Sequence, residues 1–246
     1  MLKLTFKLFA LGILTGSLLF FYHRPGFSQA APPRVVAADQ PGSPLLIVPT
    51  AVDSGNPLRP QYEYSLTNTT DKSISAYTIQ ESVSIDSGAP MVGGAFTHFP
   101  AIKLFLQPRE SRAESGGHGR IYRQPPLLIT LTVDFVEFAD GTRWGDDTGK
   151  FGERLDGKRA GGKAAIRKYR EILAQDGVDG LAKALSSPDL IKSQDLTKSY
   201  EWIEGFETGV NTVKSRLAEA KNRGGEDMIR RELAKPFDST EGRQDP

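Results

Sequence analysis

The chain has 246 residues, which is enough to bury the core of one large domain or of two smaller domains. Charged residues make up 25% of it and hydrophobic residues 38%, as is usual for a soluble globular protein, and the absence of cysteine excludes disulfides, thiolate metal sites and cysteine nucleophiles. The formal net charge of +1 depends on the first 30 residues, which hold three basic residues and no acid. The rest of the chain is therefore too close to neutral for a dedicated nucleic-acid-binding domain.

Residues 1–30 have the three parts of a secretory signal peptide. Two lysines give a positive beginning, Phe9–Tyr22 forms an apolar run, and Ser28 and Ala30 are the small residues that precede a cleavage site. The apolar run is short for a membrane span, which needs about 20 residues. We therefore expect cleavage after residue 30 and an exported bacterial protein, periplasmic or secreted, with no stable transmembrane segment. The alternative is an uncleaved N-terminal helix that anchors the protein to the inner membrane.

Residues 31–42 are rich in proline and alanine, and we expect them to form a flexible spacer. Residues 43–147 contain short strand-like stretches that are separated by turn signals and show no helical periodicity. The expected strands are Leu45–Val52, Gln61–Asn68, Ile74–Ile85, Ile102–Leu106 and a long strand within Leu127–Gly145. The glycine-rich stretches Asp86–Pro100 and Ser115–Gly119 are expected to be loops. This pattern favours an N-terminal antiparallel β-sandwich of the immunoglobulin-like type.

The stretch Leu127–Gly145 is the most strand-like part of the chain. Its apolar residues alternate with polar ones as far as Phe135, and the next apolar residue, Val136, follows directly. A shift of the alternation by one position within a strand is typical of a β-bulge. We therefore expect a bulge at this point of the last long strand.

The turn at 139–142 closes a hairpin, and two geometries fit its sequence. A two-residue loop would pair Arg143 with Phe138, whereas a type I turn followed by a left-handed glycine would pair Arg143 with Glu137. We prefer the second geometry, because it sets opposite charges across from each other and gives Trp144 an apolar partner.

Residues 150–238 lose the strand signals and are rich in helix formers, which predicts an all-helical C-terminal region. Its sequence repeats at an offset of 48 residues, in units at about 153–189 and 201–237. Each unit has the pattern of a long helix, a glycine break and a short helix that ends at a proline, so we expect a duplicated helical hairpin. The identical residues are Glu153, Gly157, Gly161, Glu171, Gly177, Asp179, Leu185 and Pro188 in the first unit and Glu201, Gly205, Gly209, Glu219, Gly225, Asp227, Leu233 and Pro236 in the second. Residues 239–246 are expected to be a disordered tail.

Two pairs of glycines lie one helical turn apart at equivalent positions of the two units. These pairs are Gly157 with Gly161 and Gly205 with Gly209. Since glycine weakens a helix, their repetition suggests that the two long helices cross closely there, whereas local fraying is the alternative. The second unit also has a seam with helical spacing that is expected to be buried, formed by Ile203, Phe206, Val210, Val213 and Leu217.

The stretch 158–170 holds six basic residues and no acid, and it is the strongest candidate for a contact site. Arg159, Lys163, Arg167 and Arg170 share one face of the expected helix. Such a face suits anionic lipid head groups, cell-wall polymer or an acidic partner. The alternative is a solvated face that is neutralised by nearby acids of the helices or of the β-region.

No motif points to a catalytic, cofactor-binding or metal-binding residue, and we expect no cofactor. His98 and His118 lie in separate glycine-rich stretches and do not have a zinc-binding spacing. Asp134 and Glu137 have the chemistry of an acid–base pair, but residues three apart on a strand face opposite sides, which favours structural roles. The acids within 140–147 do not have the order of a calcium-binding loop.

Three stretches carry a resemblance to known bacterial proteins. Ser65–Ile74 resembles the Asn-Thr-Ser-Asp-Lys-Pro-Ile element of bacterial immunoglobulin-like domains, and Leu106–Ser111 resembles their Leu-x-Pro-Gly-x-Ser turn, with Arg109 where glycine is usual. Together with Val133–Gly145, they make residues 45–240 similar to a family of uncharacterised exported bacterial proteins with an immunoglobulin-like β-sandwich and a C-terminal helical region. The resemblance implies a fold and an exported location, and it implies no activity, cofactor or catalytic residue.

The leading functional hypothesis is an exported, non-enzymatic interaction or scaffold module of the bacterial envelope, with an envelope protein or an anionic surface as partner and no nucleic acid. One alternative is a periplasmic hydrolase or carbohydrate-active protein with a site in the loops 86–100 and 115–125. The other alternative is a peripheral membrane-surface protein that binds through the basic helix face at 158–170.

Overall fold

The computed structural model of the chain describes the residues 31–53, 55–85, 91–98, 106–117, 121–187, 190–193 and 197–237. For residues 91–98 it describes the backbone alone. The signal peptide expected at 1–30 and the tail expected at 239–246 lie outside these ranges.

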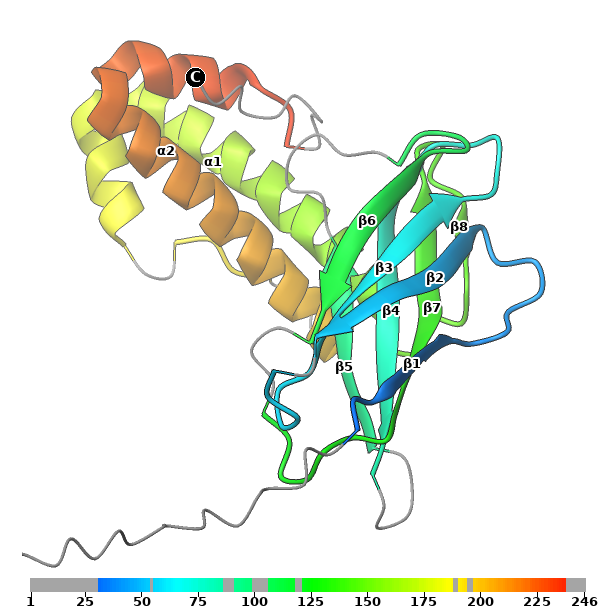
Figure 1. Ribbon diagram of the computed structural model, residues 1–246. Helices are drawn as coiled ribbons and strands as arrows, with labels where there is room; N and C mark the ends of the chain where they lie inside the picture. Colours follow the sequence, from blue (N-terminus) through cyan, green and yellow to red (C-terminus); the bar gives the residue numbers. More distant parts are fainter. Residues whose placement is uncertain are drawn as a thin grey trace, which may run out of the picture. The chain divides into compact units, whose positions relative to one another are not determined.

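The fold is mixed α+β, with β-sheets in the N-terminal part and two long helices in the C-terminal part, as expected (Figure 1). One sheet has the strand order β1-β7-β4-β5, with β8 paired to β7, and the other has the order β2-β3-β6. The elements are β1 (Arg34–Ala37), β2 (Leu45–Asp53), β3 (Gln61–Asn68), β4 (Ile74–Ser84), β5 (Met91–His98), β6 (Ser111–Gly116), β7 (Leu128–Phe138), β8 (Arg143–Trp144), α1 (Phe151–Ser186) and α2 (Tyr200–Ala234).

The two sheets share one hydrophobic core. In β3, Tyr62, Tyr64 and Leu66 are buried while the residues between them are accessible, so this strand has the expected alternation. Ile79 of β4 and Ile129 of β7, from the other sheet, are fully buried in the same cluster. Each aliphatic or aromatic side chain buried in this way contributes about 1.5–3 kcal/mol, so the contact between the sheets is the main source of stability in the β-region.

The segment 31–42, expected to be a flexible spacer, contains a strand of the first sheet. β1 pairs with β7 in parallel, so the expectation of a purely antiparallel arrangement was wrong. Val35 and Ala37 pack against the core. The side chain of Gln40 bonds both backbone groups of Val133, at 2.9 Å from Nε2 to O and at 2.8 Å from N to Oε1. Composition did not reveal this strand, because its pairing depends on a partner that is distant in the sequence.

Two stretches expected to be loops or turns contain strands. β5 occupies most of the glycine-rich stretch Asp86–Pro100, and β6 begins at Ser111 and extends into Ser115–Gly119. β6 pairs with β3 throughout its length although its side chains are mostly small or charged, so the apolar alternation that marks a strand was missing. Of the strand expected at Ile102–Leu106, only Leu106 lies within the described residues, where it forms an isolated bridge.

The hairpin between β7 and β8 has the preferred register. Glu137 pairs with Arg143, and Val136 pairs with Trp144. Gly141 has a φ of 82°, the left-handed conformation that the type I turn with a following glycine requires. The prediction of this turn is therefore confirmed.

The helices α1 and α2 cross in backbone contact, which confirms the close crossing predicted from the glycines. A Cβ atom added to Gly157 would lie 2.0 Å from the carbonyl oxygen of Trp202, and one added to Gly205 would lie 2.0 Å from that of Arg154. These two contacts are equivalent under the offset of 48 residues. The same holds for the contacts of Gly161 with Phe206 and of Gly209 with Lys158.

Both helices break at an equivalent glycine. Gly177 in α1 has φ 66° and ψ −162°, and Gly225 in α2 has φ 60° and ψ −140°. Most of the expected seam of α2 is buried, at Phe206, Val210, Val213 and Leu217, whereas Ile203 is half-buried. Among the described residues, neither helix combines the length and the apolar character needed to cross a bilayer.

Candidate functional site

The joint between the last hairpin and α1 is built on a β-bulge in β7, which lies at Asp134, slightly before the expected shift between Phe135 and Val136. The pairing between β4 and β7 skips Asp134, and its carboxylate holds the loop that follows the hairpin. Oδ1 accepts from the backbone N–H of Thr148 at 3.0 Å and from its hydroxyl at 2.7 Å, while Oδ2 accepts from the N–H of Gly149 at 3.1 Å. Asp134 is 5% exposed, so its side chain is a buried link between β7 and the approach to α1.

A second carboxylate, that of Asp147, binds the first turn of α1. Its two oxygens accept from the backbone N–H groups of Phe151 at 2.6 Å and of Gly152 at 3.0 Å, which have no partner within the helix. Burial raises the pKa of Asp147 above its ordinary value, although the two amide hydrogen bonds act in the opposite direction. Phe151 and Leu155 of α1 then pack with Phe135 in an apolar cluster separate from the core between the sheets.

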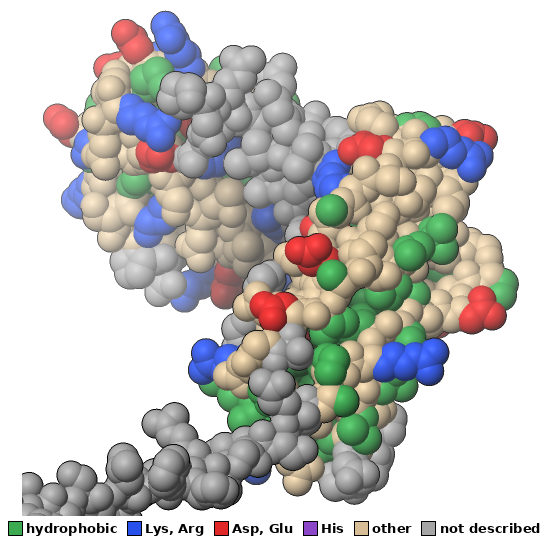
Figure 2. Space-filling view, in the orientation of Figure 1, with side chains coloured by type: hydrophobic (Ala, Val, Ile, Leu, Met, Phe, Trp, Pro, Cys, Tyr) green, Lys and Arg blue, Asp and Glu red, His purple; other side chains and the backbone are tan. Residues whose placement is uncertain are grey.

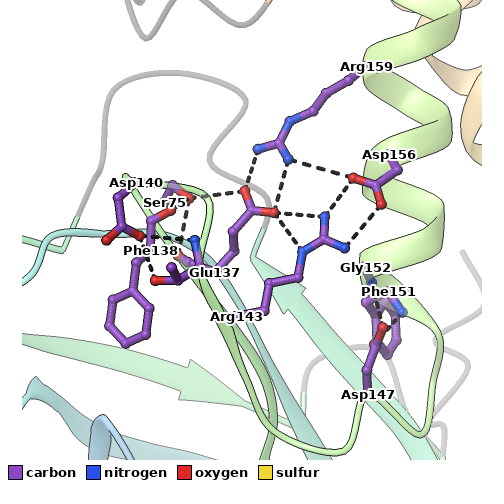
Figure 3. Close-up of polar contacts among 11 residues, drawn as sticks. Ser75, Glu137, Phe138, Asp140, Arg143, Asp147, Phe151, Gly152, Asp156 and Arg159 are labelled. Carbon is purple, nitrogen blue, oxygen red and sulfur yellow. Dashed lines mark hydrogen bonds and ion pairs between the residues drawn. The ribbon is translucent and has the colours of Figure 1, made fainter.

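Glu137 lies at the centre of an ion cluster between the hairpin and α1 (Figure 3). It is 2% exposed and accepts hydrogen bonds from Arg143 of β8, at 2.9 Å, and from Arg159 of α1, at 3.0 Å. Arg143 also binds Asp156 of α1 at 2.6 Å, so two cations and two anions join the sheet to the helix. The pairing of Glu137 with Arg143 was predicted from the sequence, and the part played by Arg159 was not.

The charges of this cluster are mutually stabilised. Burial alone would raise the pKa of Glu137, but the hydrogen bonds and charges of Arg159 and Arg143 lower the pKa below its ordinary value. The pKa of Arg143 is raised, chiefly by its hydrogen bond to Asp156. Glu137 is therefore held as a carboxylate with both of its oxygens bound, which is a structural role and not that of a proton carrier.

The four cations predicted to share a contact face have different surroundings. Arg159 is bound to Glu137, and Arg170 donates through Nε to the carbonyl oxygen of Leu233, near the end of α2, at 2.9 Å. Lys163 and Arg167 are exposed. On the face of the helical region seen in Figure 2, basic and acidic side chains are interspersed and form no continuous basic patch. Two of the four cations thus have roles within the fold that sequence spacing did not reveal.

A buried carboxylate between the sheets was missed by the sequence reasoning. Glu81 of β4 is fully buried and accepts from the hydroxyl groups of Tyr62 at 2.9 Å and of Tyr122 at 2.6 Å. Burial, and then the charge of Glu81, raise the pKa of Tyr62 well above its ordinary value. Glu81 could have been recognised from its position in β4, because it lies on the same face of the strand as the buried residues Ile79 and Val83. A carboxylate that is buried at such a position needs hydrogen-bond donors from the same chain.

The side chains of the two candidate histidines, His98 and His118, lie outside the described residues. Among the residues that are described, no group of three or more histidine, aspartate or glutamate side chains is arranged to hold a metal ion.

Asp140 binds Lys72 at 2.7 Å and Thr142 at 2.6 Å, and these hydrogen bonds lower the pKa of Asp140. It therefore closes the turn.

A groove lies in the helical region. It has a volume of about 710 Å³ and is lined by residues of α1, by the beginning of α2 and by residues 190–193 between the helices. Arg167 and Lys168 of α1 line it together with Trp202 and Phe206 of α2. The sequence showed the cations but not the aromatic residues beside them, because the two helices meet only in the folded chain.

The chain matches no known protein family and no curated protein. A solved structure of a hypothetical protein from Peptoclostridium difficile 630 shares 13% sequence identity, with a TM-score of 0.31, over 46% of this chain and 91% of the other.

Proposed function

We propose that the protein is an exported, non-enzymatic interaction or scaffold module of the bacterial envelope. In this proposal the two-sheet part is an immunoglobulin-like sandwich, and the helical part derives from a duplicated hairpin that is presented to a partner. The order of the strands around one core supports the first point. The reciprocal glycine contacts and the matching breaks at Gly177 and Gly225 support the second.

The observation that supports a non-enzymatic role is the use of the buried carboxylates. Glu81, Asp134 and Glu137 are the buried acids of the described residues, and each accepts hydrogen bonds from at least two donors of the same chain. A general acid or base has to reach a substrate proton, directly or through one water. These three side chains instead join strands to loops, to the helix or to the other sheet.

A fixed attachment of the helices favours a scaffold. The ion pair of Glu137 with Arg159 and the apolar cluster around Phe151 attach the first turns of α1 to the sheet, while Asp147 binds the first backbone N–H groups of the helix. The glycine contacts then fix α2 on α1. Function as a membrane-surface protein has less support, because Arg159 and Arg170 of the basic face make contacts within the chain.

In-cell photo-crosslinking tests this proposal. A photoreactive residue is placed at exposed positions of the helical region, such as Lys163 and Lys221, and at Val48 on the sheet, in the native exported protein. We expect one envelope protein to be captured repeatedly from one face, and we expect the mature protein to begin at Ala31. Retention in the cytoplasm, capture from no position, or hydrolysis of an envelope glycan that is lost in Glu81→Gln would each overturn the proposal.

A further inference from the structure

The groove of the helical region combines an aromatic wall with basic side chains. Trp202 and Phe206, one turn apart on α2, are stacked with ring centroids 5.4 Å apart and an interplanar angle of 26°. Phe206 is only 7% exposed, so the accessible aromatic surface belongs mainly to Trp202, which also has Lys198 over its ring. Arg167 and Lys168 of α1 add two cations to the lining, against one acid, Glu171. Lys192 of the connecting segment also lines the groove and has a contact of its own. The groove therefore offers an apolar surface together with an excess of positive charge.

The two cations of α1 that line the groove, Arg167 and Lys168, are exposed to solvent. Within the described part of the chain, Arg167 is exposed and has no ion pair. Lys168 pairs with Glu171 at 3.7 Å, and both side chains are about half exposed, so this pair contributes little and is readily exchanged. A carboxylate that approached the groove would gain charged hydrogen bonds there at small cost.

We propose that this groove binds an acidic segment of a partner polypeptide that places a large apolar side chain against Trp202. The inference rests on the proposed role as an interaction module and names the chemistry of its partner. Aromatic residues and arginine are the groups that contribute most at protein interfaces, and the basic lining selects for acidic flanks.

The shape of the site favours a polypeptide over a membrane surface. The lining on α1 runs from Ala164 to Glu171, which is about two helical turns, or about 10 Å. The groove is open and has a volume of about 710 Å³, so side chains of an extended segment can lie along it. A bilayer would instead be met by apolar groups that protrude from the protein.

Fluorescence of Trp202 provides a direct test. The chain has two tryptophans, so the Trp144→Phe variant leaves Trp202 as the reporter. Two synthetic seven-residue peptides serve as probes, with the same Leu and Phe residues and either Glu or Lys at the remaining positions. We expect the acidic peptide to change the emission of Trp202 in a saturable manner and the basic peptide to leave it unchanged. The binding should weaken with added salt.

A charge-reversal variant and a matched control locate the binding. Arg167→Glu with Lys168→Glu should weaken binding of the acidic peptide about ten-fold or more. Lys221→Glu, an exposed substitution on α2 that is not part of the groove lining, should leave binding unchanged. Thermal unfolding of each variant shows that the helices remain folded.

Three outcomes would overturn the inference. They are equal binding of both peptides, acidic-peptide binding that survives the double charge reversal, and a response of Trp202 to anionic phosphatidylglycerol vesicles without a response to the acidic peptide. If one of these occurs while photo-crosslinking still captures a partner elsewhere, the groove assignment fails and the interaction module stands.

Discussion

Replacement of Gly205 by alanine tests the backbone contact between α1 and α2. In an isolated helix this substitution stabilises by about 1 kcal/mol, because alanine has the higher helix propensity. In this protein the new Cβ would lie 2.0 Å from the carbonyl oxygen of Arg154, so the two helices have to move apart by about 1 Å. Overpacking of this kind costs about 1–3 kcal/mol, and the upper end applies here because the neighbour is backbone. The gain in helix propensity offsets about 1 kcal/mol of this cost, so we expect a net loss of about 2 kcal/mol in the free energy of unfolding.

Urea unfolding followed by helical circular dichroism measures this loss. Gly157→Ala makes the equivalent contact with Trp202 and should lose the same amount. The double variant should lose less than the sum, because both substitutions separate the same crossing. Gly141→Ala is the control, because a Cβ at this position has open space. It should cost only the 1–2 kcal/mol, roughly, that a left-handed backbone conformation costs a residue other than glycine. Its loss in the free energy of unfolding should add fully to the loss caused by Gly205→Ala or Gly157→Ala. A gain in stability for Gly205→Ala, or additive losses in the double variant, would refute the close-crossing argument.

Three further predictions concern single residues. Glu137→Gln should cost about 2 kcal/mol at neutral pH, a value reduced because its arginine partners are about one-third exposed. The pKa of Glu137 is lower in the folded protein than in the unfolded chain. The stabilisation by its carboxylate is therefore complete above the unfolded pKa of about 4.3 and is lost as the pH falls through the folded pKa. The urea midpoints of the variant and the parent should accordingly converge only in acid. Tyr62→Phe should destabilise the protein by about 1–3 kcal/mol in the same assay. The loss should exceed that of Tyr122→Phe, because Tyr122 is only half-buried and water can replace its hydroxyl group. A larger loss for Tyr122→Phe would contradict this reasoning. Gly177 and Gly225 have open space for a Cβ, but both combine a positive φ with an extended ψ, a conformation that is essentially restricted to glycine. Replacement of either by alanine should therefore cost about 1–3 kcal/mol, and unequal melting temperatures of the two variants would argue against equivalent breaks.

Local signals predicted the parts of the fold that depend on neighbouring residues. The turn at 139–142 and the bulge before it were readable, because charge pairing and alternation act within a few positions. The close crossing of the helices was readable because glycine pairs recur at Gly157 and Gly205, where propensity alone disfavours them. In each case the residues that carry the signal are also the residues that make the contact.

Features that depend on a distant partner were not predicted. The sequence left open whether acids of the β-region neutralise the basic face, and it did not identify Glu137, on β7, as the partner of Arg159. The strand β1 was hidden for the same reason, since it has only four residues and pairs with β7. The groove beside Trp202 combines α1, α2 and the segment between them, and no single stretch shows it.

The parallel pairing of β1 has a consequence for the order of folding. Gln40, just beyond β1, meets Val133 of β7 across 93 residues of chain, so this edge of the sheet closes only after β7 has emerged and paired with β4. Contacts of such separation form slowly, because the loop between them has to be ordered first. Until β1 arrives, β7 exposes an unpaired edge to other chains, and a newly made chain is then most prone to aggregate. The four residues of β1 therefore act as the cover that ends this exposure.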